Sequence, residues 1–191
     1  LSLLSEAVLG AKDEPDAVTM FATRMQSESK RLTDLVQEII NLSRIQDSDP
    51  LQEAEEVEVG YLVKEAIDQS QINAENRHIT VNYQEEKDLS VWGDRDQLTM
   101  AIQNLIDNAS QYGAAQGLIA VSLDKAADTV RLIVSNDGDT IPQSEKIKVF
   151  DPYYRILGSK SFGSGLGLAI VKEIVQQHKG LPVVCKDAFE Q

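Results

Sequence analysis

The chain has 191 residues, of which 42% are hydrophobic, so it can form a folded core and global disorder is excluded. Its formal net charge of −13 argues against nucleic-acid binding. A polyanionic ligand would need a divalent metal and local hydrogen-bond donors. The single cysteine, Cys185, excludes an intrachain disulfide and suits a reducing compartment. No stretch approaches the roughly 20 apolar residues of a membrane span and no signal peptide is visible, so we expect a soluble cytoplasmic fragment of a longer protein.

The first 47 residues predict two helices. Residues 1–10 have the pattern of a helix end closed by Gly10, and Pro15 suits the first turn of a long helix over 16–46. Apolar residues recur along that helix at spacings of three and four, with Glu28 interrupting: Val18, Phe21, Met25, Leu32, Leu35, Ile39 and Leu42. One narrow seam does not stabilise so long a helix. We therefore expect residues 1–47 to form a helical hairpin that dimerises into a four-helix bundle. The alternative is a single helix packed on its own domain.

An acidic linker at 48–55 precedes a change to mixed strand and helix patterns. Strands are predicted at 56–59, 79–83, 89–92, 118–124, 129–135 and 182–185. Helices are predicted at 60–76, 94–112, 143–150 and 166–179, with Asp94 as the N-cap of the second. The core-facing stripe of the first of these helices is expected to be Leu62, Val63, Ala66, Ile67 and Ile72. Residues 56–191 thus predict the α+β class, with helices on one face of a mixed sheet.

A polar stripe follows the predicted helix at 94–112. Asn104, Asn108 and Gln111 lie at i, i+4 and i+7, beside an expected core stripe of Leu98, Ile102, Leu105, Ala109 and Tyr112. A neutral amide oxygen is a suitable hard ligand for Mg²⁺. The stripe on its own is equally consistent with a polar helix edge that makes ordinary hydrogen bonds.

Two glycine-containing segments follow strands or precede helices. In the first, residues 135–142, a side-chain oxygen of Asn136 at a strand end can accept a hydrogen bond from an amino group, and Gly138 allows close approach of a flat ring. A simple turn explains this segment as well. In the second, residues 163–168, glycines at a helix start expose backbone N–H groups that favour phosphate, although flexible turns look the same.

Together the motifs resemble a known family. Asn104-Leu-x-x-Asn108-Ala, Asn136-x-Gly138, Phe150-Asp-Pro-Tyr-Tyr154-Arg155 and Gly163-x-Gly165-Leu166-Gly167-Leu168 are similar, in order, to the N, G1, F and G2 boxes of sensor histidine kinases. That family belongs to an ATPase superfamily that includes gyrase and Hsp90. Residues 32–45 also resemble the second helix of its dimerisation and phosphotransfer domain. The resemblance covers nearly the whole chain.

The resemblance implies a nucleotide site. Asn108 should hold Mg²⁺, Asn104 should support ATP, Asn136 should read the adenine amino group, and Arg155 should approach the phosphates. A mobile lid should span about 156–165, and the γ-phosphoryl group should pass to a histidine. The further residues expected to contact ATP are Gln111, Tyr112, Gly138, Ile141, Tyr154, Lys160, Gly163, Gly165, Leu166, Gly167 and Leu168. The implied partners are a second copy through residues 1–47 and a response regulator receiver domain, with membrane attachment only through other parts of the parent protein.

The sequence departs from the family at several positions. No residue matches the acceptor histidine, so no catalytic residue is assigned; His78 suits a surface position, and His178 suits a helix C-terminus. Asn136 replaces the usual aspartate, Gln111 replaces a common lysine, and Thr140 replaces a glycine. We therefore expect that this fragment does not phosphorylate itself. The alternatives are a degenerate nucleotide-binding regulatory module and a serine kinase of the anti-sigma type, the latter disfavoured by the long seam helix.

Overall fold

The computed structural model describes residues 2–11, 13–47, 53–156 and 163–184. The chain divides into two compact units, Leu1–Ser43 and Arg44–Gln191, which are described separately. Among the described residues, no helix is both long enough and apolar enough to cross a membrane.

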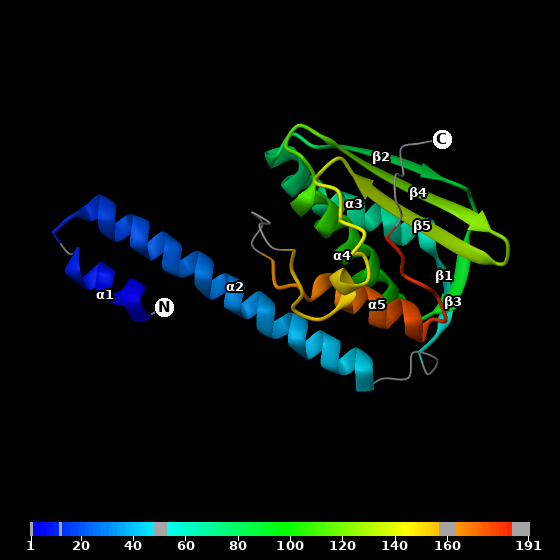
Figure 1. The fold of residues 1–191 in the computed structure, drawn as a ribbon, viewed down its shortest axis with the longest axis horizontal. Helices are drawn as coiled ribbons and strands as arrows, with labels where there is room; N and C mark the ends of the chain where they lie inside the picture. Colours follow the sequence, from blue (N-terminus) through cyan, green and yellow to red (C-terminus); the bar gives the residue numbers. More distant parts are fainter. Residues whose placement is uncertain (1, 12, 48–52, 157–162, 185–191) are drawn as a thin grey trace. The chain divides into compact units, whose positions relative to one another are not determined.

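The first unit contains α1 (Ser2–Gly10) and most of α2 (Pro15–Asp47), so both predicted helices are confirmed (Figure 1). The Ser5 hydroxyl lies 3.9 Å from the Met25 sulfur, which shows that α1 folds back beside α2 as a hairpin. Ile45 is the one buried residue of α2, and Leu32 and Ile39 remain 49% and 44% exposed. The apolar seam is therefore only partly covered within this chain: none of its residues is fully buried, and those that are half-buried are Val18, Phe21, Met25, Leu35 and Leu42.

The second unit is an α+β structure with two sheets. A two-stranded antiparallel sheet pairs β1 (Glu55–Glu58) with β3 (Ser90–Gly93). A three-stranded sheet has the order β2-β4-β5, formed by Thr80–Glu85, Leu118–Ala126 and Thr129–Asn136. It is mixed, because β2 and β4 run parallel whereas β4 and β5 are antiparallel. This confirms the predicted fold class.

Helices α3 (Val59–Asn76), α4 (Arg95–Tyr112) and α5 (Gly167–Gln177) complete the second unit. Helix α3 packs against β2, and α4 packs against β5 and between α3 and α5 (Figure 1). The Asp94 carboxylate accepts a hydrogen bond from the Gln97 N–H (3.0 Å), as expected of the N-cap of α4. Capping and helix packing together fix where α4 begins and which side it turns towards the sheet.

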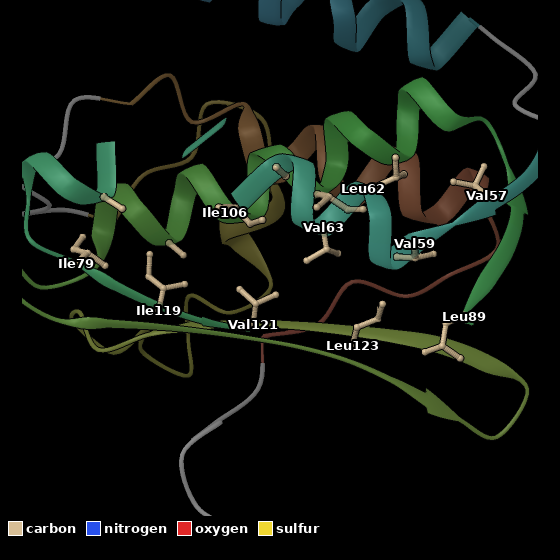
Figure 2. Packing of buried hydrophobic residues seen from close by; sticks show 14 residues of the cluster. Val57, Val59, Leu62, Val63, Ile79, Leu89, Ile106, Ile119, Val121 and Leu123 are labelled. Carbon is tan, nitrogen blue, oxygen red and sulfur yellow. The ribbon is translucent and has the colours of Figure 1, made fainter. Parts of the chain in front are cut away.

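The core lies between α3, α4 and one face of the three-stranded sheet (Figure 2). Alternate β4 residues Ile119, Val121 and Leu123 are fully buried there, which follows from the two-residue period of a strand. Leu62 and Ile106 meet them from the helices. Each fully buried aliphatic side chain stabilises the fold by about 1.5–3 kcal/mol, and this layer holds α4 rigidly against the sheet.

Three sequence predictions are wrong in detail. Ile72 is 71% exposed, because the buried face of α3 follows positions 62, 66, 70 and 74, and a residue two positions from Ser70 points away from it. The helix predicted at 143–150 is instead a run of turns that ends in a 3₁₀ helix at Lys148–Phe150, where Val149 and Phe150 are buried. Residues 182–184 form no strand in the described part of the chain, where Val183 is 63% exposed, and Cys185 lies outside the described residues.

Candidate functional site

The first and last motifs meet along one side of α4. The Asn104 Oδ1 atom lies 2.8 Å from the position that a Cβ on Gly167 would occupy. A Cβ placed on Gly163 would likewise lie 3.2 Å from the Gln111 side-chain nitrogen and 3.5 Å from the Tyr112 hydroxyl. The polar stripe of α4 and the glycine loop before α5 are therefore direct neighbours, although about 60 residues of chain separate them.

The second motif reaches the C-terminal end of α4. The Tyr112 carbonyl oxygen occupies the space that a Cβ on Gly138 would need, and the Asn136 amide nitrogen lies 2.8 Å from that same point. The Asn136 Cβ also lies 3.6 Å from the point that a Cβ on Gly113 would occupy. Only glycine at position 138 permits this close approach between the end of β5 and the end of α4.

The third motif packs on the glycine loop through its backbone. The Tyr153 N–H donates a hydrogen bond to the Gly165 carbonyl oxygen (2.9 Å), and both residues have positive φ, 64° and 78°. A Cβ on Gly165 would lie 2.9 Å from the Tyr154 carbonyl oxygen, so a glycine is needed here for space as well as conformation. All four motif segments thus form one continuous cluster around α4.

The phenol of Tyr154 is held by neighbouring charged residues. Its hydroxyl donates a hydrogen bond to the Glu145 carboxylate, and Lys148 pairs with that carboxylate at 3.6 Å. The Lys148 ammonium also lies 6.0 Å from the centre of the Tyr154 ring. These contacts attach the turn at 143–150 to the third motif.

The start of α5 offers backbone donors. Leu166 is fully buried, and its own N–H donates to the Ser164 hydroxyl (3.0 Å), which anchors the loop in front of the helix. The next three N–H groups, those of Gly167, Leu168 and Ala169, precede the first helical hydrogen bond, in which the Ile170 N–H donates to the Leu166 carbonyl (2.9 Å). Leu168 is half-buried. The helix dipole adds positive potential at this end, so the arrangement suits an anionic group.

Asn108 lies one turn from both Asn104 and Gln111, and its side chain is half-buried. The Asn104 amide nitrogen donates to the Met100 carbonyl (2.8 Å), which turns Asn104 Oδ1 towards Gly167. By contrast, no described residue makes a hydrogen bond with the Asn108 side chain. The described residues contain no cluster of three histidine, cysteine or carboxylate side chains that could hold a metal. Mg²⁺ is usually bound through one or two protein groups together with phosphate oxygens and water, and a single amide oxygen is a suitable ligand of that kind.

Asp137 does not take the place of the aspartate that Asn136 replaces. Its carboxylate accepts hydrogen bonds from the backbone N–H groups of Ala114 (3.3 Å) and Leu118 (3.0 Å). It is therefore directed at the loop between α4 and β4. At this end of the cluster, the polar group beside Gly138 is the neutral carboxamide of Asn136.

Three of the expected site residues are not placed by these contacts. Lys160 and most of the expected lid lie outside the described residues. Ile141 is half-buried, and no recorded contact joins it to the four segments. Arg155 is also half-buried and already interacts with the rest of the chain.

The contacts of Arg77 and one of the two ring hydrogen bonds of His178 were not predicted from the sequence. Arg77, at the C-cap of α3, donates to three backbone carbonyls at the end of α4. His178 Nε2 accepts from the Asp94 N–H (3.0 Å), and its Nδ1 then donates to the Ile174 carbonyl (2.8 Å). The helix C-terminus explains only the second of these bonds. His78 is exposed, as expected of a surface histidine.

The groups with shifted pKa values lie at the far end of β2. The Lys64 ammonium hydrogen bond, at 2.6 Å, and then the Tyr83 hydroxyl lower the pKa of Glu85. Burial, followed by the hydrogen bond to Glu85, raises the pKa of Tyr83. The carboxylate also lies next to Gly60 at the start of α3, where the helix dipole favours it. This cluster joins α3 to β2 and contains no residue of the four motifs.

Comparison with known proteins agrees with the geometry. The family model described as "Histidine kinase-, DNA gyrase B-, and HSP90-like ATPase" matches residues 93–188. The sensor-like histidine kinase SenX3 of Mycolicibacterium smegmatis is 34% identical over 183 residues, which cover 94% of this chain and 48% of that protein. The chain thus spans about half the length of this curated relative.

Solved structures give the same result. The mycobacterial sensor histidine kinase MprB is 28% identical with a TM-score of 0.59, over 66% of this chain and 80% of that one. The structure of histidine kinase ThkA in complex with response regulator protein TrrA has a TM-score of 0.72 over 94% of this chain and 51% of that one. Its identity is 24%, so it supports the fold alone.

Proposed function

Because this chain belongs to the histidine kinase-, DNA gyrase B- and HSP90-like ATPases and contains the catalytic domain of a sensor histidine kinase, we propose that it binds ATP with Mg²⁺ and transfers the γ-phosphoryl group to a histidine. The observation that carries the proposal is that three separated segments gather around α4, which contains the first motif. Asn104 meets Gly167, Tyr112 meets Gly138 and Gly163, and Tyr153 meets Gly165.

In this proposal the nucleotide lies along the polar stripe of α4. The phosphates are bound by the N–H groups at the start of α5, with Arg155 and Lys160 as the nearby cations. The adenine is bound at the end of β5, beside Asn136 and Gly138, with Tyr112 lining the site. The support is chemical: helix N-termini bind phosphate, and the glycines at 138, 163 and 167 keep side chains out of this space.

Asn108 is the proposed Mg²⁺ ligand, through its amide oxygen. When bound, the ion would neutralise charge on the phosphates, which matters in a chain of net charge −13. The chain's own residues would orient the triphosphate and exclude water, and positioning and electrostatic stabilisation account for most of the catalysis in phosphoryl transfer. Asn104 would support this arrangement from the preceding turn of α4.

The adenine end is where this chain departs from its family. A carboxamide accepts through its oxygen without a negative charge, so its bond to an amino group is weaker than that of a carboxylate. Asp137 is already occupied by the Ala114 and Leu118 N–H groups. The base is therefore held by Asn136 itself, with lower affinity than a carboxylate would give.

Neither histidine of the chain is the proposed phosphoryl acceptor. Both ring nitrogens of His178 are engaged, with the Asp94 N–H and the Ile174 carbonyl. His78 lies between α3 and β2 with a positive φ of 55°, and it belongs to neither α1 nor α2. The acceptor would come from outside residues 1–191, so this chain alone does not phosphorylate itself.

Residues 1–47 are proposed to form part of the dimerisation and phosphotransfer hairpin, with 48–55 as a linker and 56–191 as the ATP-binding domain. Exposed Leu32, Val36 and Ile39 on α2 support pairing with a second copy. A response regulator receiver domain is proposed as a partner because the chain belongs to the histidine kinase family, and the ThkA structure is itself a complex with a response regulator protein. Replacing Leu32 and Ile39 by glutamate should give a monomer in sedimentation analysis, whereas Thr19→Glu on the polar face should not; a monomeric wild type would contradict the dimer.

Transfer in trans tests the kinase function. The chain would be incubated with labelled ATP and a hairpin from a sensor kinase that carries the acceptor histidine. Acid-labile label on that hairpin, lost in the Asn108→Ala variant, is the expected result. ATP binding without transfer to any matched hairpin would favour the second candidate, a regulatory module without kinase activity, to which the replacements at Asn136, Gln111 and Thr140 point.

A further inference from the structure

The guanidinium of Arg77 is surrounded by backbone carbonyls from the end of α4. Nη1 donates to the Ser110 carbonyl and to the Gln111 carbonyl (2.9 Å), and Nη2 donates to the Gly113 carbonyl (2.7 Å). Arg77 itself is the C-cap residue of α3, so one side chain joins the ends of two helices. A planar guanidinium with several donors suits this role, whereas a lysine would present a single ammonium group.

The carbonyls that Arg77 holds have few other partners. The last four carbonyl groups of a helix have no intrahelical donor, and they carry the negative end of the helix dipole. At this helix end, the Gly113 N–H satisfies only the Ala109 carbonyl (2.8 Å). Arg77 therefore supplies both the missing hydrogen bonds and a compensating positive charge.

The same helix end forms one wall of the candidate site. The Gln111 and Tyr112 side chains face Gly163, and the Tyr112 carbonyl oxygen excludes any side chain at Gly138. Residues 111–113 are therefore held by Arg77 on one side and contact the nucleotide motifs on the other. A shift of residues 111–113 would therefore change the packing at both the glycine loop and the end of β5.

The loop that follows α4 is fixed from two sides. The Arg77 carbonyl accepts a hydrogen bond from the Gln116 N–H (3.0 Å). On the other side, the Asp137 carboxylate accepts from Ala114 and Leu118. The position of this loop thus depends on Asp137, which belongs to the second motif, and on Arg77, which belongs to none of the four motifs.

We propose that Arg77 is a positioning residue for the nucleotide site, which acts by holding the C-terminal end of α4 and its loop against the adenine end of the cluster. The inference rests on the proposed function, because it takes the ligand of this cluster to be ATP. Arg77 acts through residues 111–113 and does not touch the nucleotide.

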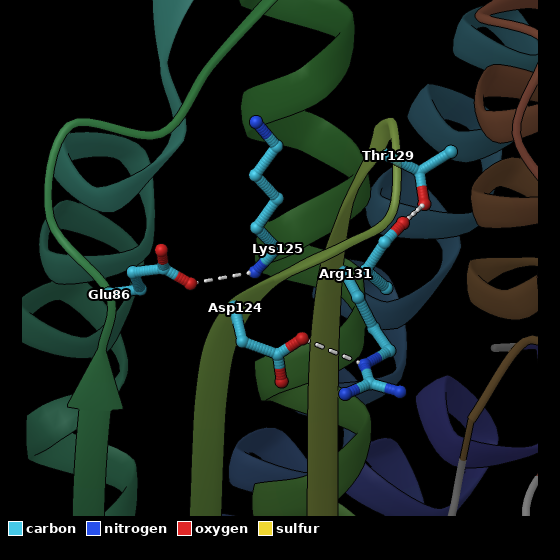
Figure 3. A network of polar contacts seen from close by, with 6 residues as sticks. Glu86, Asp124, Lys125, Thr129 and Arg131 are labelled. Atoms are coloured by element: carbon cyan, nitrogen blue, oxygen red, sulfur yellow. Dashed lines mark hydrogen bonds and ion pairs between the residues drawn. The ribbon is translucent and has the colours of Figure 1, made fainter.

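The test compares Arg77→Met, Arg77→Lys and Arg77→Gln with the wild-type chain. Binding of Mg²⁺·ATP and of adenosine is measured by NMR titration, and folding by circular dichroism and thermal unfolding. Arg131→Met is the matched control, because Arg131 pairs with Asp124 at 2.9 Å near the β4–β5 turn, at the other end of β5 from Asn136 (Figure 3). It removes one arginine charge from the face of β5 opposite the one on which Val130 and Leu132 pack against the core.

The expected result is that Arg77→Met lowers the affinity for ATP and for adenosine by a similar factor of about ten or more. Arg77→Lys and Arg77→Gln should recover only part of the loss. The glutamine amide has only two donors, and the lysine ammonium has three but lacks the planar fork that reaches these separate carbonyls. In the ligand-free spectra, the amide signals of Gly138 and Gly163 should shift in the Arg77 variants and stay unchanged in Arg131→Met. If Arg77→Met does not fold, the affinities of Arg77→Lys and Arg77→Gln are compared with that of the wild-type chain instead.

Wild-type affinity in any folded Arg77 variant would overturn the proposal. Loss of ATP binding with unchanged adenosine binding would overturn it too, since that pattern indicates a charge effect on the phosphates and not positioning. These outcomes are distinct from a failure of the proposed function, in which the wild-type chain itself would not bind ATP.

Discussion

The side-chain oxygen of Asn104 lies 2.8 Å from the point where a Cβ on Gly167 would be placed. The two residues belong to the middle of α4 and the first turn of α5, and their contact sets how closely the two helices approach at the candidate site. The Asn104 amide nitrogen is bonded to the Met100 carbonyl, so the side chain is not free to rotate away without losing that bond.

Gly167→Ala should therefore displace Asn104 and weaken ATP binding by about tenfold, equivalent to roughly 1.4 kcal/mol. The loss should be strongly non-additive with Asn104→Ala, because the smaller side chain removes the clash. Titration calorimetry on the two single variants and the double variant measures this coupling. Additive losses would show that the two residues act independently at the site.

Gly138→Ala should be more damaging, because the obstructing atom is the Tyr112 backbone carbonyl, which cannot rotate away as a side chain can. We expect a destabilisation of about 1–3 kcal/mol, typical of overpacking, together with loss of ATP binding. Urea unfolding gives the stability. Gly10→Ala is the control: no atom lies within 4 Å of its Cβ position, so that variant should be neutral or slightly more stable. Equal stability of the two variants would refute the steric argument.

The parts of this molecule that depend on local sequence could be predicted, and the parts that depend on tertiary contacts could not. Asp94 caps α4 as expected, because a cap needs only the next three residues. The motif glycines were recognisable because their spacing is short and ordered. Arg77 was missed, since its acceptors are backbone carbonyls, which leave no trace in the sequence. Ile72 was misplaced because Ser70, bonded to Asp107, takes the buried position on α3.

His178 should contribute to stability through its two ring bonds. His178→Ala leaves the Asp94 N–H and the Ile174 carbonyl without their partner, which should cost about 1–3 kcal/mol for the unsatisfied groups. Thermal and urea unfolding measure the loss, and nitrogen NMR should find the proton of the neutral ring on Nδ1. His78→Asn is the control, since asparagine tolerates the positive φ at this exposed site. A ring proton on Nε2 would contradict the assigned bonds.

The stability of the fold should depend on pH through Glu85, which lies away from the proposed nucleotide site. Its folded-state pKa is lowered, chiefly by the Lys64 hydrogen bond, so ionised Glu85 stabilises the fold above the ordinary glutamate pKa of about 4.3. That contribution is lost as the pH falls through the lowered value. In Lys64→Met the Glu85 pKa should rise towards its ordinary value, and the stability difference from wild type should shrink in acid. NMR titration measures the pKa; a larger change in Lys87→Met, whose charge has the smaller effect, would contradict the assignment.

We propose that the cluster around α4 binds ATP through Mg²⁺ at Asn108. Titration calorimetry of the 191-residue chain with ATP, in the presence and absence of Mg²⁺, measures this binding. We expect saturable binding that requires Mg²⁺. It should be weakened about tenfold or more in Asn108→Ala and unchanged in Asn82→Ala, which alters an exposed asparagine on β2. Failure to bind at ATP concentrations above roughly 1 mM, the weak end of common enzyme affinities, or equal binding by the two variants, would refute this assignment.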